Sequence, residues 1–402
     1  MVARIRTDAA FAAALAALSL TFAACSDGAH DTVDDTSTTS AALNPTTDPT
    51  TDPTTDPATG ATTSTIPATL SPLDFNGDGQ VVIGVATTGP AEGGGWSQSL
   101  VDAARALSAE QGFAAPIVID SIAPTDAAAR IGDLAQQPVD VIVIGAAALA
   151  VPLTDLIAQH PDIYWYCNCG AGIARNAGLL QVTDSGAEIG YTAGYATGLL
   201  LDASGLRRAT VIGCCDRGLE KQIYNSFEDG LQAVDATFRM TYVRTGDLEY
   251  DFDNTKNATD AFRTAVDERT HAVFPFLDGA HRAVARAANE AGKILLSAGS
   301  STACADDELA YDVAVGFDGA DYLRAVLPNI IDGTLLEGQT RLFAVGVDPE
   351  PGAVICNPTP KQRAAMDAVY ARIAAGDFDE QFAKVTEKAF AAELALAQGV
   401  PD

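Results

Sequence analysis

Short runs of β-branched and other apolar residues alternate with longer stretches of helical period from residue 81 onward. The runs are typical of strands, and the stretches between them repeat apolar positions every three or four residues. Strands are expected at residues 81–87, 116–120, 139–145, 163–167, 179–183, 209–213, 239–244, 271–276, 293–298 and 312–317. Helices are expected in the gaps, among them residues 97–111, 186–201, 219–233, 259–266 and 279–291. This alternation indicates βα units and parallel sheets.

The expected strands form two series, each long enough for a doubly wound sheet. The chain after residue 72 is also longer than a single hydrophobic core usually supports. The sequence therefore predicts an α/β fold with two Rossmann-like lobes joined by a hinge. Lobe one is expected to hold residues 73–183 and about 312–335, and lobe two residues 184–298 and about 336–395. Ligands bind at the carboxyl ends of strands in such sheets, so the loops there are the candidate site.

The N-terminal segment has the composition of an export signal. Two arginines precede an apolar, Ala/Leu-rich run over residues 9–24 that is too short to span a bilayer stably. We therefore expect a signal peptide over residues 1–24. The run ends in TFAAC (21–25), which resembles the lipobox of bacterial lipoproteins, where cleavage leaves an acylated cysteine at the N-terminus. Lipidation of Cys25 would hold the protein on the extracytoplasmic face of the cell membrane. Ordinary secretion with an incidental cysteine is the alternative.

Residues 25–72 have a composition unlike that of a folded domain. They are rich in Thr, Asp, Pro and Ala, with a TTDP near-repeat over residues 46–57, and contain almost no large apolar residues. Such a segment cannot bury enough surface to offset the entropy lost on ordering. We expect a disordered, partly extended tether.

Acidic residues dominate the charged positions. The chain has 53 Asp and Glu against 24 Lys and Arg, and a net charge of −29. This balance argues against nucleic acid as a partner and against a polybasic contact with anionic lipids. A solvated acidic surface is the simplest interpretation.

Six cysteines follow Cys25, and an even number in an exported protein favours disulfides. They are Cys167, Cys169, Cys214, Cys215, Cys304 and Cys356. The first two and the next two each follow a predicted parallel strand, so we expect these two pairs to face one another at one sheet edge. The last two would then join two C-terminal loops. A thiolate metal site is the alternative, although CxC and CC spacings are not the usual zinc pattern.

Motifs that carry catalytic chemistry are missing from the sequence. The four histidines stand singly without HExxH, no GxSxG or GxxxxGK string occurs, and GAGIAR (170–175) lacks the third glycine of a dinucleotide loop. No base and nucleophile can be paired from the remaining residues. We therefore expect neither an enzyme nor a cofactor or metal site.

One polar segment matches part of a calcium loop. Residues 74–79, DFNGDG, place oxygen ligands at alternate positions with glycine at the turn. The position that requires a bidentate glutamate is Val85, inside the first predicted strand. A polar turn is the favoured interpretation, and a calcium site is the alternative.

Three segments carry a family resemblance: VVIGVATTGPAEGGGWSQSLVDAARAL (81–107), GYTAGYATG (190–198) and ATVIGCCDRGLEKQIYNSFEDGLQAV (209–234). Together they resemble the basic membrane protein family of ABC-transporter solute-binding lipoproteins, which includes purine-nucleoside receptors. The resemblance covers about residues 81–378. It implies the type I periplasmic-binding-protein fold, a monomer, a small-molecule ligand between the lobes and an ABC importer permease as partner.

The resemblance also implies a site for a nucleoside-like solute. A planar base is best held between aromatic faces, while carboxylates accept sugar hydroxyls. Trp96 and Phe276 are the candidate faces, and Asp184 and Asp278 the candidate carboxylates. The alternatives are a helix-capping role for Trp96, a core position for Phe276 and an N-cap role for Asp184.

Two further candidates lie where the chain departs from the family. Ser97 stands where the family usually has asparagine after the first aromatic residue. Asp318 stands near the position of the family's site lysine. These changes weaken the inference about the solute more than the inference of a solute-binding protein.

Capture of a solute for an ABC importer is the function that the sequence favours. A binding module that signals to a membrane receptor would have the same fold, and an exported enzyme would need a reactive pair in the cleft. Sequence alone does not separate the importer role from the sensor role.

Overall fold

The computed structural model describes residues 71–92, 95–170, 173, 175–246 and 251–397. The predicted signal peptide, Cys25 and all but the end of the predicted tether lie outside these residues. Within the described part of the chain, no helix is long and apolar enough to cross a membrane.

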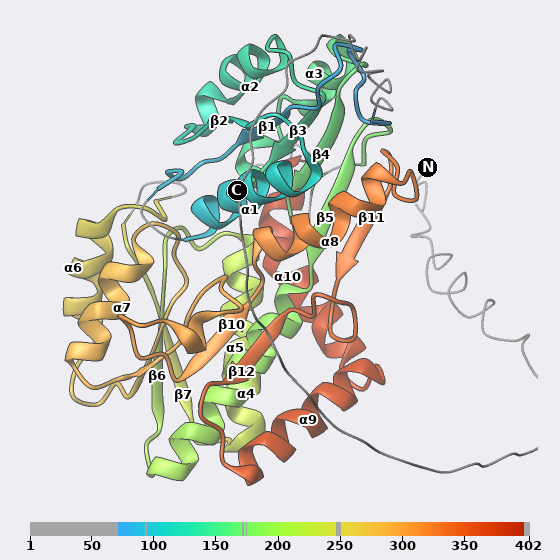
Figure 1. The fold of residues 1–402 in the computed structure, drawn as a ribbon. Helices are drawn as coiled ribbons and strands as arrows, with labels where there is room; N and C mark the ends of the chain where they lie inside the picture. The colour runs from blue at the N-terminus through green and yellow to red at the C-terminus, as the bar shows by residue number, and fades with distance from the viewer. Residues whose placement is uncertain (1–70, 93–94, 171–172, 174, 247–250, 398–402) are drawn as a thin grey trace, which may run out of the picture. The chain divides into compact units, whose positions relative to one another are not determined.

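The first sheet contains six parallel strands among the described residues, in the order β11-β5-β4-β3-β1-β2 (Figure 1). Apolar side chains alternate between its two faces, so each face packs on helices. The strands are β1 (Ile83–Ala86), β2 (Ile117–Ile119), β3 (Val141–Ile144), β4 (Tyr164–Asn168), β5 (Leu180–Asp184) and β11 (Thr340–Phe343). Helices α1 (Trp96–Gln111) and α8 (Gly319–Ile331) share one core with it, and α2 (Ala127–Ala135) and α3 (Leu153–Gln159) share the other.

The second sheet contains four parallel strands, in the order β7-β6-β8-β9, in the described residues. They are β6 (Arg208–Gly213), β7 (Arg239–Arg244), β8 (Ala272–Pro275) and β9 (Ile294–Leu295). One core includes α4 (Gly186–Ser204) and α5 (Gly218–Val234), and the other α6 (Thr255–Ala265) and α7 (His281–Glu290). Helices α9 (Pro360–Ala374) and α10 (Asp379–Ala397) pack against α4 and α5. Short 3₁₀ turns are Pro124–Asp126, Ala147–Leu149 and Ala303–Ala305.

Both sheets confirm the predicted α/β fold, and all ten predicted strands correspond to strands of the structure. Strands β11 and β12 (Gly352–Ile355) were not predicted. Three of the four side chains of β11 are exposed, so it lacks the apolar run that identified the other strands.

Two strands decide how the C-terminal part divides between the sheets. Strand β11 pairs with β5 in the first sheet, and β10 (Val313–Gly316) pairs with β12 and bridges to Leu296, just after β9 in the second sheet. The sequence grouped residues 312–335 with lobe one and 336–395 with lobe two. The lobe boundaries stay a prediction, and we propose that β10 belongs with lobe two and β11 with lobe one.

Helices α4 and α5 approach each other unusually closely, because glycines face the partner helix. A Cβ atom built on Gly190 or Gly194 would overlap the backbone carbonyl oxygen of Ile223 or Phe227, respectively. A Cβ on Gly230 of α5 would overlap the carbonyl oxygen of Tyr191. The segment GYTAGYATG (190–198) carries part of the family resemblance, and its glycines therefore serve the packing of α4 against α5.

Candidate functional site

A cavity of about 490 Å³ lies at the carboxyl ends of strands from both sheets. Residues that follow or end β3, β4 and β5 line it from the first sheet, and residues that follow β6 and β8 line it from the second. This is the place where open α/β sheets bind ligands. Its lining includes Trp96, Asn168, Asp184, Arg217, Leu219, Glu220, Phe276, Asp278 and Phe317.

Three aromatic rings form a row along the cavity. The ring centroids of Trp96 and Phe317 are 6.0 Å apart with an interplanar angle of 27°, and those of Phe317 and Phe276 are 5.5 Å apart. The indole Nε1 of Trp96 donates a hydrogen bond to the carbonyl oxygen of Gly145 at 2.8 Å, which orients the ring. Phe317 was missed in the sequence, although its place at the end of the strand 312–317 could have identified it.

Asp184 ends β5 and lines the cavity beside Tyr322, whose hydroxyl donates to Oδ2 at 3.3 Å. Burial raises the pKa of Asp184 to about 6, and this hydrogen bond partly offsets the effect of burial. The N-cap of α4 is Ser185, whose side chain accepts from Glu188, so the alternative N-cap role falls to the next residue. Asp184 thus lies where a solute in the cavity could donate to it.

Asn168 is a second polar lining residue, and the sequence analysis missed it. It ends β4, is 6 % exposed, and its Nδ2 has no hydrogen-bond partner among the described residues. A buried donor without a partner is costly unless a ligand or water supplies an acceptor. Its place directly after the predicted parallel strand 163–167 was the signal available in the sequence.

Ser97 and Asp278 contact each other. The Ser97 hydroxyl donates to Asp278 Oδ2 at 2.8 Å, and the Ser97 amide donates to Oδ1 at 3.4 Å. Burial and the nearby Asp253 raise the pKa of Asp278 to about 7, while the hydrogen bonds from Ser97 and Trp96 act in the opposite direction. Asp278 lines the cavity, whereas Ser97 is almost fully buried behind it.

Asp318 lies outside the residues that line the cavity. Its side chain caps α8 by accepting from the Ala320 amide at 2.9 Å and also accepts from the Ser99 hydroxyl at 2.6 Å. Burial raises its pKa to about 6. The structure therefore shows a helix cap at this position, and the predicted contact with a solute stays a prediction.

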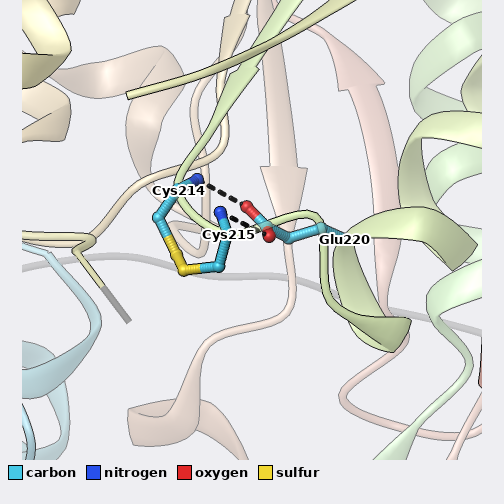
Figure 2. A group of neighbouring side chains, drawn as sticks. All are labelled: Cys214, Cys215 and Glu220. Carbon is cyan, nitrogen blue, oxygen red and sulfur yellow. Dashed lines mark hydrogen bonds between the residues drawn. A yellow bond between two sulfur atoms is a disulfide. The ribbon is translucent and has the colours of Figure 1, made fainter. Parts of the chain in front are cut away.

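The loop between β6 and α5 is organised by Glu220 (Figure 2). Its carboxylate accepts from the amides of Cys214 at 2.6 Å and Cys215 at 2.9 Å. It also accepts from the Arg217 amide at 3.2 Å. Burial raises the pKa of Glu220, and these hydrogen bonds lower it in part. These hydrogen bonds fix the conformation of the loop. Arg217 and Leu219, which belong to it, line the cavity.

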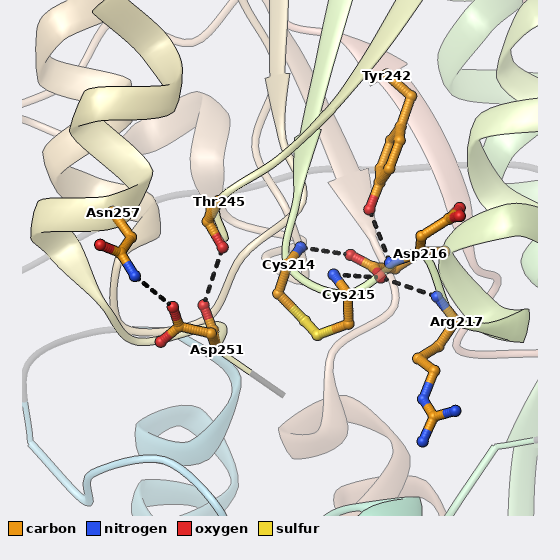
Figure 3. Close-up of a disulfide and its surroundings, with 9 residues drawn as sticks. Cys214, Cys215, Asp216, Arg217, Tyr242, Thr245, Asp251 and Asn257 are labelled. Carbon is orange, nitrogen blue, oxygen red and sulfur yellow. Dashed lines mark hydrogen bonds between the residues drawn. A yellow bond between two sulfur atoms is a disulfide. The ribbon is translucent and has the colours of Figure 1, made fainter. Parts of the chain in front are cut away.

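Tyrosines complete the support of this loop (Figure 3). Asp216, with a φ of 55°, donates its amide to the hydroxyl of Tyr242 at 3.0 Å. The hydroxyl of Tyr224 donates to the Asp216 carboxylate at 2.8 Å, and its ring stacks on Tyr242. Asp251 lies in the segment before α6, and its carboxylate accepts from the side-chain amide of Asn257 in that helix at 2.9 Å.

The predicted arrangement of the first four cysteines stays a prediction, and the structure brings together different partners. The structure pairs Cys167 with Cys169 and Cys214 with Cys215, instead of placing one pair against the other. Cys167 and Cys169 lie at the carboxyl end of β4 in the first sheet, whereas Cys214 and Cys215 follow β6 in the second. The structure places Cys304 beside Cys356, with Cα atoms 5.1 Å apart, and the predicted disulfide between them stays a prediction.

The sulfur atoms of Cys214 and Cys215 and a carboxylate oxygen of Glu220 lie close enough together to suggest a cation site. In the structure the two sulfurs bind each other, and both oxygens of Glu220 accept backbone amides (Figure 2). These potential metal-ligand atoms therefore already bind other groups of the protein and hold the loop.

Residues 74–79 form a turn whose side chains bind its own backbone. Asp74 accepts from the amides of Gly77 at 2.9 Å and Gly79 at 3.0 Å, and Asn76 accepts from Asp78 at 2.9 Å. The buried Asp140 holds the segment by accepting from Phe75 at 3.0 Å. These contacts agree with the polar-turn interpretation.

Comparison with known proteins places the chain in a family. Residues 80–303 match the family model described as ABC transporter substrate-binding protein PnrA-like. No curated protein matches the sequence.

Similar solved structures share the fold at low sequence identity. A solute-binding protein of an ABC transporter system from Conexibacter woesei is 19% identical, with a TM-score of 0.56, covering 74% of this chain and 97% of that one. One from Aeropyrum pernix is 12% identical, with a TM-score of 0.59, covering 78% and 92%. A transcriptional activator of the comK gene from Bacillus halodurans is 16% identical, with a TM-score of 0.57, covering 72% and 96%.

These similarities agree with the two parallel sheets and with the resemblance found in the sequence. The structures show the two-lobed periplasmic-binding-protein fold, and the family model covers more than half of the chain. The chain therefore belongs to the family of PnrA-like ABC transporter substrate-binding proteins.

Proposed function

We propose that this protein captures a nucleoside-like solute in the cavity between its two sheets and delivers it to the permease of an ABC importer. The observation that supports this proposal most directly is the row of Trp96, Phe317 and Phe276 in a cavity that the buried Asn168 and the half-buried Asp184 also line. An aromatic face suits a planar base, and amide and carboxylate groups suit its polar edges and sugar hydroxyls. The cavity volume lies in the range usual for small-molecule sites.

The remaining features of the proposal concern the anchor and the covalent framework. A lipid on Cys25 and a tether over residues 25–72 would hold a monomeric body at the extracytoplasmic face of the membrane. We propose disulfides at the three cysteine pairs that the structure joins. Binding without chemical conversion is proposed, because the family model that the chain matches describes substrate-binding proteins.

A thermal-shift panel tests the class of solute. Purine and pyrimidine nucleosides, free bases, free ribose and hexoses are compared on protein freed of carried-over solute by unfolding and refolding. A solute that binds the folded state at 100 times its Kd stabilises it by about 2.7 kcal/mol, so at least one nucleoside is expected to raise Tm clearly. Stabilisation by hexoses with no response to nucleosides would overturn the proposed class and leave a receptor for another solute.

Replacing Asp184 by Asn is expected to weaken the binding of ribonucleosides about tenfold. The carboxylate accepts charge-assisted hydrogen bonds that a neutral amide does not match, and its removal also leaves Tyr322 with a weaker acceptor. The loss is measured by calorimetry against 2′- and 3′-deoxynucleosides, for which it should be smaller. Asp202→Asn, an exposed change near the end of α4, is the matched control. Equal losses for all nucleosides would argue against a contact with sugar hydroxyls.

Peptide mapping under non-reducing conditions is expected to recover a peptide pair joined through Cys304 and Cys356. These residues are 52 positions apart, and their Cα atoms are 5.1 Å apart, within the range that a disulfide spans. The pairs Cys167–Cys169 and Cys214–Cys215 should each appear within a single peptide. A crosslink between these two pairs would contradict the structure and restore the arrangement predicted from sequence.

A further inference from the structure

Two residues that the sequence predicts to bind the solute contact each other. Ser97 follows Trp96 at the start of α1 in the first lobe, and Asp278 lies two residues after Phe276 in the second. The distances from Asp278 to the Ser97 hydroxyl and amide, 2.8 Å and 3.4 Å, describe a carboxylate held at both oxygens. The contact therefore joins the two segments that carry the outer aromatic rings.

Glycines make this close approach possible. A Cβ built on Gly89 would lie 2.6 Å from Asp278 Oδ2 and 2.7 Å from the Ser97 hydroxyl oxygen. Gly95, with a φ of 92°, is close enough to Asp278 that a Cβ there would overlap its carboxylate. The first-lobe side of the contact is thus shaped around the carboxylate, with no room for a larger side chain.

The second-lobe side is held rigidly by its own backbone. The amides of Asp278 and Ala280 donate to the Phe252 carbonyl, each at 3.2 Å, and the Gly279 amide donates to Asp253 at 2.7 Å. The turn that presents Asp278 is therefore anchored on the segment before α6. A carboxylate on such a turn has a defined position when it meets the other lobe.

Helix α1 has no cap from its own segment. Gly95 occupies the N-cap position without a side-chain hydrogen bond, and the first turn contains no acidic residue. The amides of a helix N-terminus favour a negative group. In this structure the group is the carboxylate of Asp278 from the other lobe.

We propose that Ser97 and Asp278 form a clasp between the lobes that sets the spacing of the aromatic walls. The inference rests on the proposed function, because the clasp matters for binding only if the solute lies between those walls. Both residues are positioning residues: they act through Trp96 and Phe276 and do not contact the solute. Breaking the clasp should therefore lower the affinity for every solute by the same factor.

A double-mutant cycle tests the clasp with Ser97→Ala, Asp278→Ala and the pair of changes. In the wild-type background, Ser97→Ala removes a hydrogen bond to a carboxylate and is expected to weaken nucleoside binding about tenfold. In the Asp278→Ala background the same change should cost less than about twofold. Ser108→Ala is the matched control, because Ser108 is equally buried on α1 and its hydroxyl has no partner among the described residues.

Hydrogen exchange of the solute-free protein provides a readout that does not depend on a solute. Asp278→Ala is expected to increase exchange at the first-turn amides of α1 about tenfold, because the carboxylate that they bind is lost. Ser108→Ala should leave their exchange unchanged. If the effect of Ser97 were confined to its own side chain, the first-turn amides would stay protected from exchange in Asp278→Ala.

The two measurements separate the clasp from the proposed solute. Non-additive losses with faster exchange support the clasp, and equal factors for several nucleosides support its positioning role. Altered exchange without binding of any nucleoside would overturn the nucleoside assignment and support the inter-lobe contact alone. Additive losses with unchanged exchange would overturn the clasp even if nucleosides bind. Losses that depend on the functional groups of the nucleoside would make Ser97 or Asp278 a direct contact and overturn the positioning role.

Discussion

Replacing Trp96 by alanine is expected to weaken nucleoside binding by about 10- to 100-fold. Stacking of a base on an aromatic side chain contributes about 1–3 kcal/mol, and each 1.4 kcal/mol corresponds to a tenfold change in affinity. Trp96 lines the cavity, and its ring is held in place by the hydrogen bond to Gly145 and by contact with Phe317. The loss is measured as a change in Kd by calorimetric titration.

Two variants show whether this loss comes from stacking. Trp96→Phe keeps a flat face but loses the hydrogen bond to Gly145, so it should recover most of the affinity. Phe75→Ala removes an exposed aromatic side chain outside the cavity and should have no effect. If Trp96→Ala bound nucleosides as tightly as the wild type, Trp96 would be part of the scaffold and not a wall for the solute.

Replacing Gly194 by leucine is expected to lower the free energy of unfolding by more than about 4 kcal/mol, or to prevent folding. Overpacking of a close interface usually costs about 1–3 kcal/mol, and here the new side chain would meet the backbone carbonyl of Phe227. Backbone atoms cannot turn aside as a flexible side chain can. Helices α4 and α5 would have to separate, and both belong to the core of the second sheet. Denaturant unfolding of the purified protein measures the change.

Gly132→Ala is the matched control for this loss. Gly132 also lies inside a helix, α2, but the nearest atom to a Cβ there is Leu156 Cδ2 at 3.6 Å, an ordinary contact. Alanine favours a helix over glycine by roughly 1 kcal/mol, so this variant should be as stable as the wild type or more stable. Wild-type stability for Gly194→Leu would show that the close helix contact is not required.

The fold could be predicted from sequence because several of its strands, such as β1, β3 and β8, are buried on both faces. Residues 141–144, VIVI, form a continuous apolar run between helical stretches, and such runs identify parallel strands without knowledge of their partners. The order of the strands within each sheet could not be predicted, because strand pairing depends on contacts between segments that are distant in the sequence. The pairing of β11 with β5 is one such contact, and β11 itself is too exposed to stand out.

The candidate site could be predicted in part for the same reason. Trp96, Asp184 and Phe276 lie at the ends of recognisable elements, and the structure places all three in the lining of one cavity. The sequence could not show that Ser97 meets Asp278, because that contact joins residues from different lobes. Nor could it show that Phe317 lies between the outer rings, since its position depends on how the β10 segment returns to the cavity.

Calorimetric titration of the refolded, solute-free protein with purine and pyrimidine nucleosides tests the central claim most directly. The proposed function predicts saturable binding of at least one nucleoside at one site per chain, with a Kd in the micromolar range or tighter. The proposed function would be contradicted if the folded protein bound no nucleoside of the panel, whether binding is measured directly or by competition between ligands. The chain would then remain a member of its family with a cleft built for a different solute.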